Sequence, residues 1–381
     1  MVNGPAAPQN YKAEGGACVE AGVVDSSLEV QPDETLINQP KFTEDTAPLI
    51  LAGLVSIAEP ENRLSLKKAI ECCESLGETR DHKKIFLYRY HAESPVMNEI
   101  GRLREESFRL IGEGTGQTRD IDQYDLYYMH IVLWDEQDLE IVGAYRLCST
   151  NRSSVLPGGI DSSSNNELPG VESRHLYTSS LFEYTASAES ILKAGLELGR
   201  SFVQPKYWGS RSLEYLWYGI SAFLRRHPEY RYLFGAVSIS NTLSTPAKDI
   251  LIRYYQRYYG STSEQSSQAA VCKRPYKIEA ASRARIDALF DTQDRKEAFT
   301  TLKKQLRYLG FAVPVLYKQY AELSKPGGTQ FLGFNIDPDF NDCVDGLVVV
   351  DINQMSELKR KRYGLLDHKT TESEAHNNDR L

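Results

Sequence analysis

The distribution of hydrophobic and polar positions predicts that helices and strands are mixed from about residue 47 onward. Short runs rich in Val, Ile, Leu, Tyr and Phe are typical of strands, and they occur at 84–91, 127–134, 139–147, 196–204, 232–239, 330–335 and 347–351. Apolar residues with helical spacing occur at 64–76, 94–111, 210–227, 246–259 and 295–309. This mixture predicts an α+β domain around a mixed α/β sheet.

Local signals support several of these elements. Ser94 and Pro95 form a helix start, with serine at the cap and proline at the first helical position. The acidic turn 135–138 joins two strand-like runs and predicts a β-hairpin. Pro228 ends the helix at 210–227, whose apolar face contains Leu213, Leu216, Trp217, Ile220, Phe223 and Leu224.

The charge of the chain is uneven. Of the net charge of -8, residues 1–50 supply -6, because two lysines stand against eight carboxylates. The tail from Gly364 supplies another -2, so that residues 51–363 are formally neutral. A general nucleic-acid binder would need a strong basic excess, and we therefore expect no nucleic-acid partner. Residues 1–46 are expected to be a disordered acidic leader and residues 364–381 a flexible tail.

The six cysteines and the N-terminus indicate the compartment. The cysteines have no C-x-x-C spacing, which is consistent with free thiols in a reducing environment. No basic segment followed by an apolar core begins the chain, and the longest apolar stretch, at 48–58, is too short to cross a bilayer. We therefore expect a cytoplasmic protein that is at most associated with a membrane surface.

Charged residues stand near the predicted helix at 94–111 and the hairpin. Arg104 precedes Phe108 by four positions and shares its helix face, although a solvated arginine above a core phenylalanine would give the same pattern. Asp122 and Asp125 stand before the first hairpin strand, where they can bind a cation or cap a turn. Arg146 ends the second strand and can pair with them, or form a surface ion pair.

A second cluster joins the predicted strand at 196–204 to the following helix. Glu197 lies on the strand, and the turn after it contains Lys206, Gly209, Ser210 and Arg211. Backbone N–H groups and the dipole at a helix N-terminus favour an anion, and the two basic side chains add positive charge. This turn is therefore a candidate phosphate site.

These residues together resemble a known superfamily. Arg104-x-x-x-Phe108, Asp122-x-x-Asp125, Gly143-x-x-Arg146 and Glu197-x-x-Arg200 follow, in order and spacing, the acyl-carrier-protein-dependent branch of the GNAT superfamily, which includes the acyl-homoserine-lactone synthases. The run at 197–220 is more similar to the ornithine-lipid-type (hemolysin-like) amino-acid N-acyltransferases. The resemblance covers about residues 84–363. The tryptophan that lactone synthases have after the phenylalanine is absent here, which counts against lactone synthesis.

The resemblance implies a GNAT-like acyltransferase core at 47–260, with a C-terminal extension at 261–363 packed on it. It implies an enzyme that transfers a fatty acyl group, in some cases 3-hydroxylated, from acyl-ACP to the α-amine of an amino acid. The product would be a lyso-aminolipid such as lyso-ornithine lipid, a step of lipid biosynthesis. Acyl-ACP, or acyl-CoA, would be a cosubstrate; neither a bound cofactor nor a metal is expected. The expected partners are acyl carrier protein, an amino acid and, peripherally, an anionic membrane. The basic run 359–362 can dock on anionic phospholipid headgroups or on the acidic carrier protein, although a solvated helix end would give the same pattern.

The resemblance also suggests roles for residues. Glu197, Arg200 and Tyr254 are the catalytic candidates, with Glu197 as the base for the amine and Tyr254 as a proton donor to the leaving thiolate. Arg104, Phe108, Asp122, Asp125 and Arg146 would shape the acceptor pocket, with Arg104 or Arg146 binding the acceptor carboxylate. Lys206, Gly209, Ser210 and Arg211 would hold the phosphopantetheine phosphate. Cys148 has no recognisable histidine partner and is expected to be structural.

Two alternatives remain open. A CoA-dependent N-acetyltransferase would use acetyl-CoA without a carrier protein. A catalytically silent GNAT-like module would bind acyl-ACP or lipid without releasing a thiol.

Overall fold

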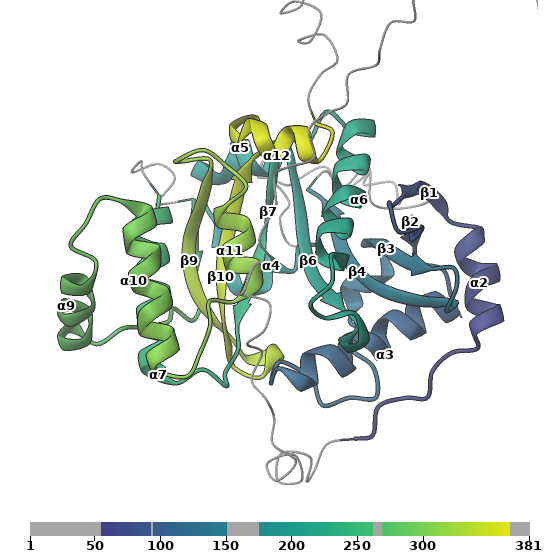
Figure 1. Cartoon of the computed structure of the whole chain (residues 1–381), viewed down its shortest axis with the longest axis horizontal. Helices are drawn as coiled ribbons and strands as arrows, with labels where there is room; N and C mark the ends of the chain where they lie inside the picture. The colour runs from purple at the N-terminus through teal and green to yellow at the C-terminus, as the bar shows by residue number, and fades with distance from the viewer. Residues whose placement is uncertain (1–54, 93, 151–174, 262–268, 366–381) are drawn as a thin grey trace, which may run out of the picture. The chain divides into compact units, whose positions relative to one another are not determined.

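The computed structural model describes residues 55–92, 94–150, 175–261 and 269–365 (Figure 1). Within these ranges an eight-stranded sheet has the order β1-β2-β3-β4-β6-β7-β10-β9. Its strands are β1 (Glu74–Glu78), β2 (Lys84–Arg89), β3 (Met129–Asp135), β4 (Glu140–Ser149), β6 (Gly195–Val203), β7 (Tyr232–Ile239), β9 (Thr329–Asp337) and β10 (Cys343–Asp351). Only β6 and β7 pair in parallel, and the other neighbours are antiparallel. The predicted mixed α+β fold is confirmed.

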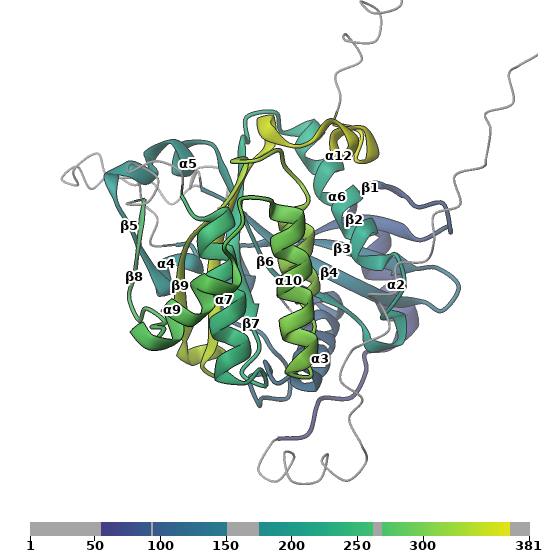
Figure 2. The ribbon, with the colours of Figure 1, turned by 60° about the vertical axis from the view of Figure 1, so that its left-hand side comes forward.

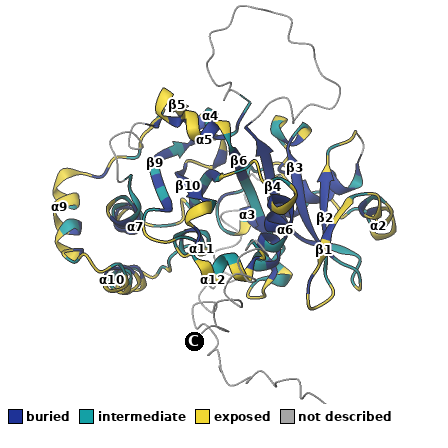
Figure 3. Cartoon of the chain, turned by 90° about the horizontal axis from the view of Figure 1, so that it is seen from above, coloured by how far each residue is buried: buried dark blue, intermediate teal, exposed yellow. Residues whose placement is uncertain are grey.

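Helices cover both faces of this sheet. On one face lies α3 (Pro95–Leu110), which packs on Phe86, Val132 and Trp134. The opposite face carries α6 (Ser212–Arg226) and α7 (Thr245–Tyr259), with α9 (Ala280–Leu289), α10 (Arg295–Tyr308) and α11 (Val315–Ala321) near α7 (Figure 2). Viewed from above, the strands between these layers are largely buried, whereas the outer sides of α9 and α10 are exposed (Figure 3).

Smaller elements complete the described part. A two-stranded sheet of β5 (Phe182–Tyr184) and β8 (Ala270–Cys272) lies with α4 (Thr178–Leu181) and α5 (Glu189–Lys193) on the α3 side, where they bury Phe234 and Leu347. The remaining helices are α2 (Arg63–Glu71) and α12 (Glu357–Arg362). No helix in the described ranges has both the length and the apolar composition that a membrane crossing requires.

Most predicted elements are present, and one prediction was wrong in part. The helix expected at 64–76 ends at Glu71, and β1 follows it. Leu76 is buried because it faces inward from an edge strand whose other residues are exposed, and this single apolar position had extended the helical pattern. The short elements β5, β8, α9, α11 and α12 were not predicted. The expected leader at 1–46 and most of the tail lie outside the described residues.

The segment 261–363 does more than pack on the preceding domain, because β9 and β10 continue the same sheet. β10 pairs with β7 over its last eight residues, from Val344 opposite Ile239 to Asp351 opposite Tyr232. Residues from the C-terminal part of the chain therefore reach the centre of the sheet. This position matters for the candidate site described below.

The sheet opens between its two parallel strands. β6 and β7 pair only over Gly195–Glu197 and Tyr232–Phe234. On its other side β6 pairs with β4 and forms a β-bulge. Ala144 is opposite Phe202 and Arg146 is opposite Gly199, so β6 has one residue more than β4 between these two pairs. Arg200 lies in this bulge with a φ of 48°, a left-handed conformation that is uncommon for a residue with a side chain. The bulge bends β6 and directs Arg200 into the region beside the opening.

Candidate active site

A buried charged cluster connects α3 with the centre of the sheet. Arg104 donates from both terminal nitrogens to the two oxygens of Asp125, each at 2.8 Å. The Nη1 of Arg146 on β4 donates to Asp125 Oδ1 at 3.1 Å. All three side chains are at most 1% exposed. This burial excludes the alternatives of a solvated arginine at position 104 and a surface ion pair at position 146.

The electrostatics of the cluster follow from its arginines. Burial alone would raise the pKa of Asp125, but the guanidinium groups of Arg104 and Arg146 outweigh it and hold that pKa well below its usual value. His130 lies 3.1 Å from Asp125 Oδ1, and burial lowers the pKa of its ring despite this carboxylate. Asp125 is therefore ionised and His130 neutral near pH 7.

The spacing of the two aspartates has a local structural cause. They form a capping box around the short 3-10 helix Gln123–Leu126. Asp122 Oδ1 accepts from the N–H of Tyr124 at 2.9 Å and of Asp125 at 3.2 Å, and Asp125 Oδ2 accepts from the N–H of Asp122 at 2.9 Å. Asp122 also accepts from Arg146 at 2.7 Å. The turn therefore both caps itself and presents two carboxylates to the arginines.

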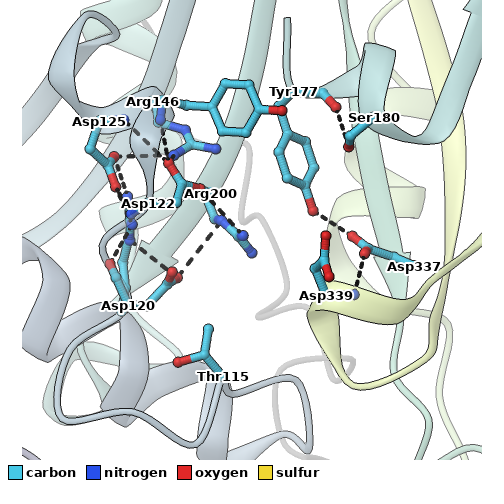
Figure 4. A network of polar contacts seen from close by, with 12 residues as sticks. Thr115, Asp120, Asp122, Asp125, Arg146, Tyr177, Ser180, Arg200, Asp337 and Asp339 are labelled. Atoms are coloured by element: carbon cyan, nitrogen blue, oxygen red, sulfur yellow. Dashed lines mark hydrogen bonds and ion pairs between the residues drawn. The ribbon is translucent and has the colours of Figure 1, made fainter.

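Arg200 differs from the other two arginines because its donors are little used. Its guanidinium carbon lies 4.3 Å from the ring centroid of Phe340 and 5.1 Å from that of Tyr177. Its nearest carboxylate oxygens are at 3.6 Å on Asp122 and 3.8 Å on Asp120, beyond hydrogen-bond length. The side chain is 8% exposed, and its Nε has no hydrogen-bond partner among the described residues. Figure 4 shows it pointing toward the side where Tyr177, Asp337 and Asp339 lie.

Glu197 is fully engaged in holding the segment that follows residue 174. Its Oε2 accepts from the hydroxyl of Tyr128 and, at 3.1 Å, from the N–H of Tyr177. Its Oε1 accepts from the N–H of Thr178 at 2.7 Å. The side chain is buried. The structure therefore gives Glu197 an anchoring contact that the sequence did not reveal, and its oxygens are already occupied.

The other expected catalytic and acceptor-pocket residues lie in different surroundings. Phe108 packs edge-on against Phe340, with ring centroids 5.3 Å apart, and through Phe340 it adjoins Arg200. Tyr254 on α7 is buried among aromatic rings that include Tyr258 and Phe290, in the core on the opposite face of the sheet. Burial raises the pKa of the Tyr254 hydroxyl far above its usual value. The structure thus groups Phe108 with Arg200 and leaves Tyr254 apart from them.

Cys148 is buried, as expected of a structural cysteine. Its thiol donates to the carbonyl of Ser149 at 3.3 Å. Burial, together with the charge of Glu197, raises the pKa of this thiol far above its usual value. A thiolate nucleophile at this position is therefore strongly disfavoured.

The turn between β6 and α6 lies where the sequence placed it. Its two cations are paired with acids: Lys206 Nζ lies 2.5 Å from Asp138 and 2.6 Å from Glu140, and Arg211 Nε donates to Glu214 at 2.9 Å. Gly209 has a φ of 79°, which favours glycine. Ser210 Oγ accepts from the N–H of Ser212, the first residue of α6, at 3.2 Å. The donors of this turn that remain for an anion are mainly backbone groups.

Sequence reasoning missed a group of buried acids on the other side of Arg200, which consists of Glu113, Asp337 and Asp345. The hydroxyl of Tyr177 donates to Asp337 Oδ2. Burial and the neighbouring carboxylates raise the pKa of Asp345 to about 7 and that of Glu113 to about 8. Asp345, two residues before the apolar run Leu347–Val350, was the available signal, but its neighbours come from segments far apart in sequence. Among the described residues no group of His, Cys, Asp and Glu side chains is arranged to hold a metal ion.

The comparisons with known proteins agree with this fold. The model of the acetyltransferase (GNAT) domain matches residues 103–218, which include the second half of α3, the hairpin, β6 and the start of α6. The chain is 29% identical to the glycine N(alpha)-acyltransferase of Phocaeicola vulgatus over 74% of this chain and 84% of the relative. It is 27% identical to the protein of the same name from Bacteroides thetaiotaomicron, over 81% of this chain and 89% of the relative.

More distant matches have related names. The L-ornithine N(alpha)-acyltransferase of Rhodobacter capsulatus is 26% identical over 64% of this chain and 79% of the relative. A solved CoA-dependent acyl-homoserine lactone synthase is 14% identical over 74% of this chain and 96% of that one, with a TM-score of 0.31, too low to support an argument. The chain is a GNAT-type acyltransferase. Within this superfamily it is similar, over most of its length, to proteins named amino-acid N(alpha)-acyltransferases.

Proposed function

We propose that the protein transfers a fatty acyl group from an acyl thioester, carried by acyl carrier protein, to the α-amine of glycine or ornithine. The observation that carries the proposal is Arg200, a buried guanidinium with unused donors beside the opening of the sheet. The relatives named for glycine and for ornithine support the choice of acceptor. The product is an N-acyl amino acid, the lyso form of an aminolipid.

Arg200 is the arginine best suited to bind the acceptor carboxylate. A guanidinium binds a carboxylate through two parallel N–H donors, and this geometry needs donors that are free. Arg104 and Arg146 already donate to Asp125 and Asp122 at 2.7 to 3.1 Å. Within the described ranges, the ion-pair contacts of Arg200 are the longer ones at 3.6 and 3.8 Å. A ligand carboxylate can therefore bind Arg200 without breaking the buried cluster.

The opening between β6 and β7 suits the acyl thioester. Where two strands part, backbone N–H and C=O groups face each other without a partner, and an extended chain with amide groups can pair with them. The pantetheine arm of an acyl carrier has such amides. A Cβ built on Gly199 would meet no atom within 4 Å, which shows that space exists beside the bulge. At this edge of the sheet the turn 204–211 leads into α6, whose N-terminus suits the pantetheine phosphate.

The chemistry that follows is direct attack by the amine. The acceptor must lose one proton before its nitrogen attacks the thioester carbonyl, and a backbone N–H of β6 would stabilise the developing oxyanion. The C–S bond then breaks, and the thiolate takes up a proton. A covalent acyl-cysteine is not needed, because the buried thiol of Cys148 is held in its protonated form. The enzyme would work in the cytoplasm, beside the membrane that receives its product.

Thiol release tests this function. Purified protein is mixed with 3-hydroxyacyl-ACP, acyl-CoA or acetyl-CoA and with glycine, ornithine, lysine or no acceptor, and products are identified by mass spectrometry. Acceptor-dependent release from a long-chain thioester, with an N-acylglycine or N-acylornithine product, would establish the reaction. Turnover of acetyl-CoA alone would favour a CoA-dependent acetyltransferase. Binding of acyl-ACP without release would favour a silent module.

A further inference from the structure

The carboxyl groups of Asp337 and Asp345 form a buried pair on the two C-terminal strands of the sheet. Asp345 stands on β10 opposite Ser238 of β7. Ser238 lies in the part of β7 that is not paired with β6. Asp337 is the last residue of β9. In the β9–β10 ladder Asp345 is opposite Asn335 and Asp337 is opposite Cys343, so the two aspartates are diagonal neighbours on one face of the sheet, and each residue is 1% exposed. Burial and the nearby Asp337 carboxyl group make ionisation of Asp345 unfavourable and raise its pKa.

Arg200 faces this pair across the opening. Burial raises the pKa of both Asp345 and Glu113, and the positive charge of the Arg200 guanidinium opposes this rise. Both carboxyl groups are therefore close enough to Arg200 to interact with its charge. Tyr177 links the two sides, because its ring lies under Arg200 and its hydroxyl donates to Asp337. Phe340, on the turn just after Asp337, covers the other side of the guanidinium. A buried arginine whose Nε has no hydrogen-bond partner in the described part of the chain therefore lies next to a buried pair of carboxyl groups.

The charge of the whole region favours a cationic group. Counted over the described residues, three guanidinium groups lie here, those of Arg104, Arg146 and Arg200, against seven carboxylates: Glu113, Asp120, Asp122, Asp125, Glu197, Asp337 and Asp345. His130 is neutral, since burial lowers its pKa. Burial and mutual repulsion keep protons on part of the acids, and an ammonium group would replace those protons with a favourable charge pair. The charge excess lies on the Asp337–Asp345 side, away from the saturated Asp125 cluster.

We infer that the Asp337–Asp345 pair binds the α-ammonium group of the acceptor and that Asp345 takes its proton, while Arg200 holds the carboxylate of the same amino acid. This inference rests on the proposed acyl transfer and assigns its amine site. The acceptor would lie across the opening, with its nitrogen beside the thioester carbonyl. Thr115, Asp122 and Asp339 stand around the same space with partly or fully exposed side chains, and they form the entrance (Figure 4).

The proton balance of the step is complete. The acceptor arrives as an ammonium with three N–H protons, and the first passes to Asp345. The neutral nitrogen attacks the carbonyl carbon, and the tetrahedral adduct loses a second proton as the C–S bond breaks. The thiolate takes up one proton to become the thiol, and one proton leaves the site from Asp345 to solvent. The amide keeps the third, so no oxidant, reductant or other co-reactant is needed.

The pH dependence follows from the groups around Asp345. Glu113, Asp337 and Cys343 lie near it as acids, Arg200 as the cation and Tyr177 as a phenol, whereas Tyr317 acts on it from the opposite face of the sheet. Burial and Asp337 raise the pKa of Asp345 to about 7, so that below this pH the carboxyl group is protonated and cannot accept the amine's proton. The kcat/KM for the amino acid should therefore fall on the acid side of about pH 7.

The Asp345→Asn variant provides the main test, with the acyl thioester that the wild-type protein turns over. We expect kcat/KM for glycine or ornithine to fall on the order of 10²-fold, and the remaining rate to follow only the neutral fraction of the amino acid in solution. The α-aminooxy acid that matches the acceptor (aminooxyacetate for glycine) is neutral at its nucleophilic nitrogen near pH 7. It needs no base, so its rate should fall much less. Retention of the wild-type rate and pH profile with the amino acid, or an equal fall with both nucleophiles, would overturn the inference.

Two further variants keep the test decisive. Asp249→Asn is the matched control, because Asp249 on α7 is a buried aspartate that accepts from the Tyr276 hydroxyl at 2.8 Å and lies outside the site. It should keep the wild-type profile. If Asp345→Asn does not fold, Asp337→Asn removes the neighbour that raises the pKa of Asp345 and should move the acid limb to lower pH; an unmoved limb would contradict the inference. A wild-type protein that acylates no amino acid would instead refute the proposed function, and the inference with it.

Discussion

Replacing Asp125 by asparagine should destabilise the fold strongly, because the carboxylate balances two buried guanidinium groups. Asp125 accepts from both terminal nitrogens of Arg104 at 2.8 Å, from Arg146 at 3.1 Å and from the N–H of Asp122 at 2.9 Å. An asparagine has the same size but no charge, and its amide nitrogen would have to face a donor. Removing one partner of a buried ion pair costs about 3–5 kcal/mol, because the remaining charge stays buried without compensation.

The matched control is Asp287→Asn, which breaks an aspartate–arginine pair of similar geometry near the surface. Asp287 binds Arg253 through two contacts, at 2.5 and 3.1 Å, but the side chains are 32% and 22% exposed. A pair in contact with solvent contributes at most about 1 kcal/mol. Urea denaturation of both variants, followed by circular dichroism, measures the difference in the free energy of unfolding. Equal and small losses in the two variants would refute the argument that burial gives the Asp125 cluster its stabilising effect.

The effect of Asp125→Asn should also depend on pH. The pKa of Asp125 is lowered in the folded protein by Arg104 and Arg146 against the effect of burial. A carboxylate with a lowered pKa stabilises the fold above its unfolded pKa of about 3.9, and this contribution is lost as the pH falls toward the folded value. The stability gap between wild type and variant should therefore be complete at pH 7 and close below about pH 4. A gap that stays constant down to pH 3 would show that packing, rather than charge, causes it.

Three further substitutions separate the roles in the site. Arg200→Lys should raise the KM for the amino acid, measured from initial rates, on the order of tenfold or more, because lysine cannot bind a carboxylate through two parallel donors. The melting temperature should change little, and an unchanged KM would show that Arg200 does not bind the acceptor. Glu197→Gln should lower stability and kcat together without moving the pH profile, since the hydrogen bonds from Tyr128 and Thr178 need the carboxylate. If the fall of kcat/KM on the acid side disappeared in this variant, Glu197 would be the base instead. Cys148→Ala should retain most activity, and mass spectrometry should detect no acyl-enzyme with the wild type; a covalent adduct at Cys148 would refute direct attack.

Local patterns predicted the central elements of the fold well. The bounds of β7 agree with the predicted strand at 232–239, and α3 begins at Pro95 as the serine–proline pair indicated. Both signals are local: a buried strand needs a run of apolar residues, and a proline fits the first turn of a helix. The short strand β1 was missed because one buried residue, Leu76, gives no alternation to detect. The pattern of apolar residues therefore predicts helices and strands of normal length, but it did not predict the five-residue edge strand β1.

The sequence predicted the arginine–aspartate cluster of the candidate site but not the pair of acids on the C-terminal strands. Arg104, Asp122, Asp125 and Arg146 were selected from motif spacing, and the structure brings them into one cluster. The spacing could not show that three donors already occupy Glu197, because the N–H groups of Tyr177 and Thr178 come from a separate segment. Asp337 and Asp345 escaped notice because their meeting with Arg200 depends on β10 pairing with β7, about a hundred residues away in sequence. Contacts of this kind follow from sheet order, which no local pattern encodes.

The distribution of charge across the site explains why two groups of acids with different protonation can exist side by side. Asp125 touches two guanidinium groups and remains ionised, whereas burial and the neighbouring Asp337 raise the pKa of Asp345 to about 7. Arg200 lies between them with weak contacts to the first group and only electrostatic contact with the second. A zwitterionic acceptor fits this gradient in one orientation only, with its carboxylate at Arg200 and its ammonium toward Asp345. The same gradient would therefore orient the amino acid and poise its nitrogen for deprotonation, and a reversed charge at either end should abolish both effects together.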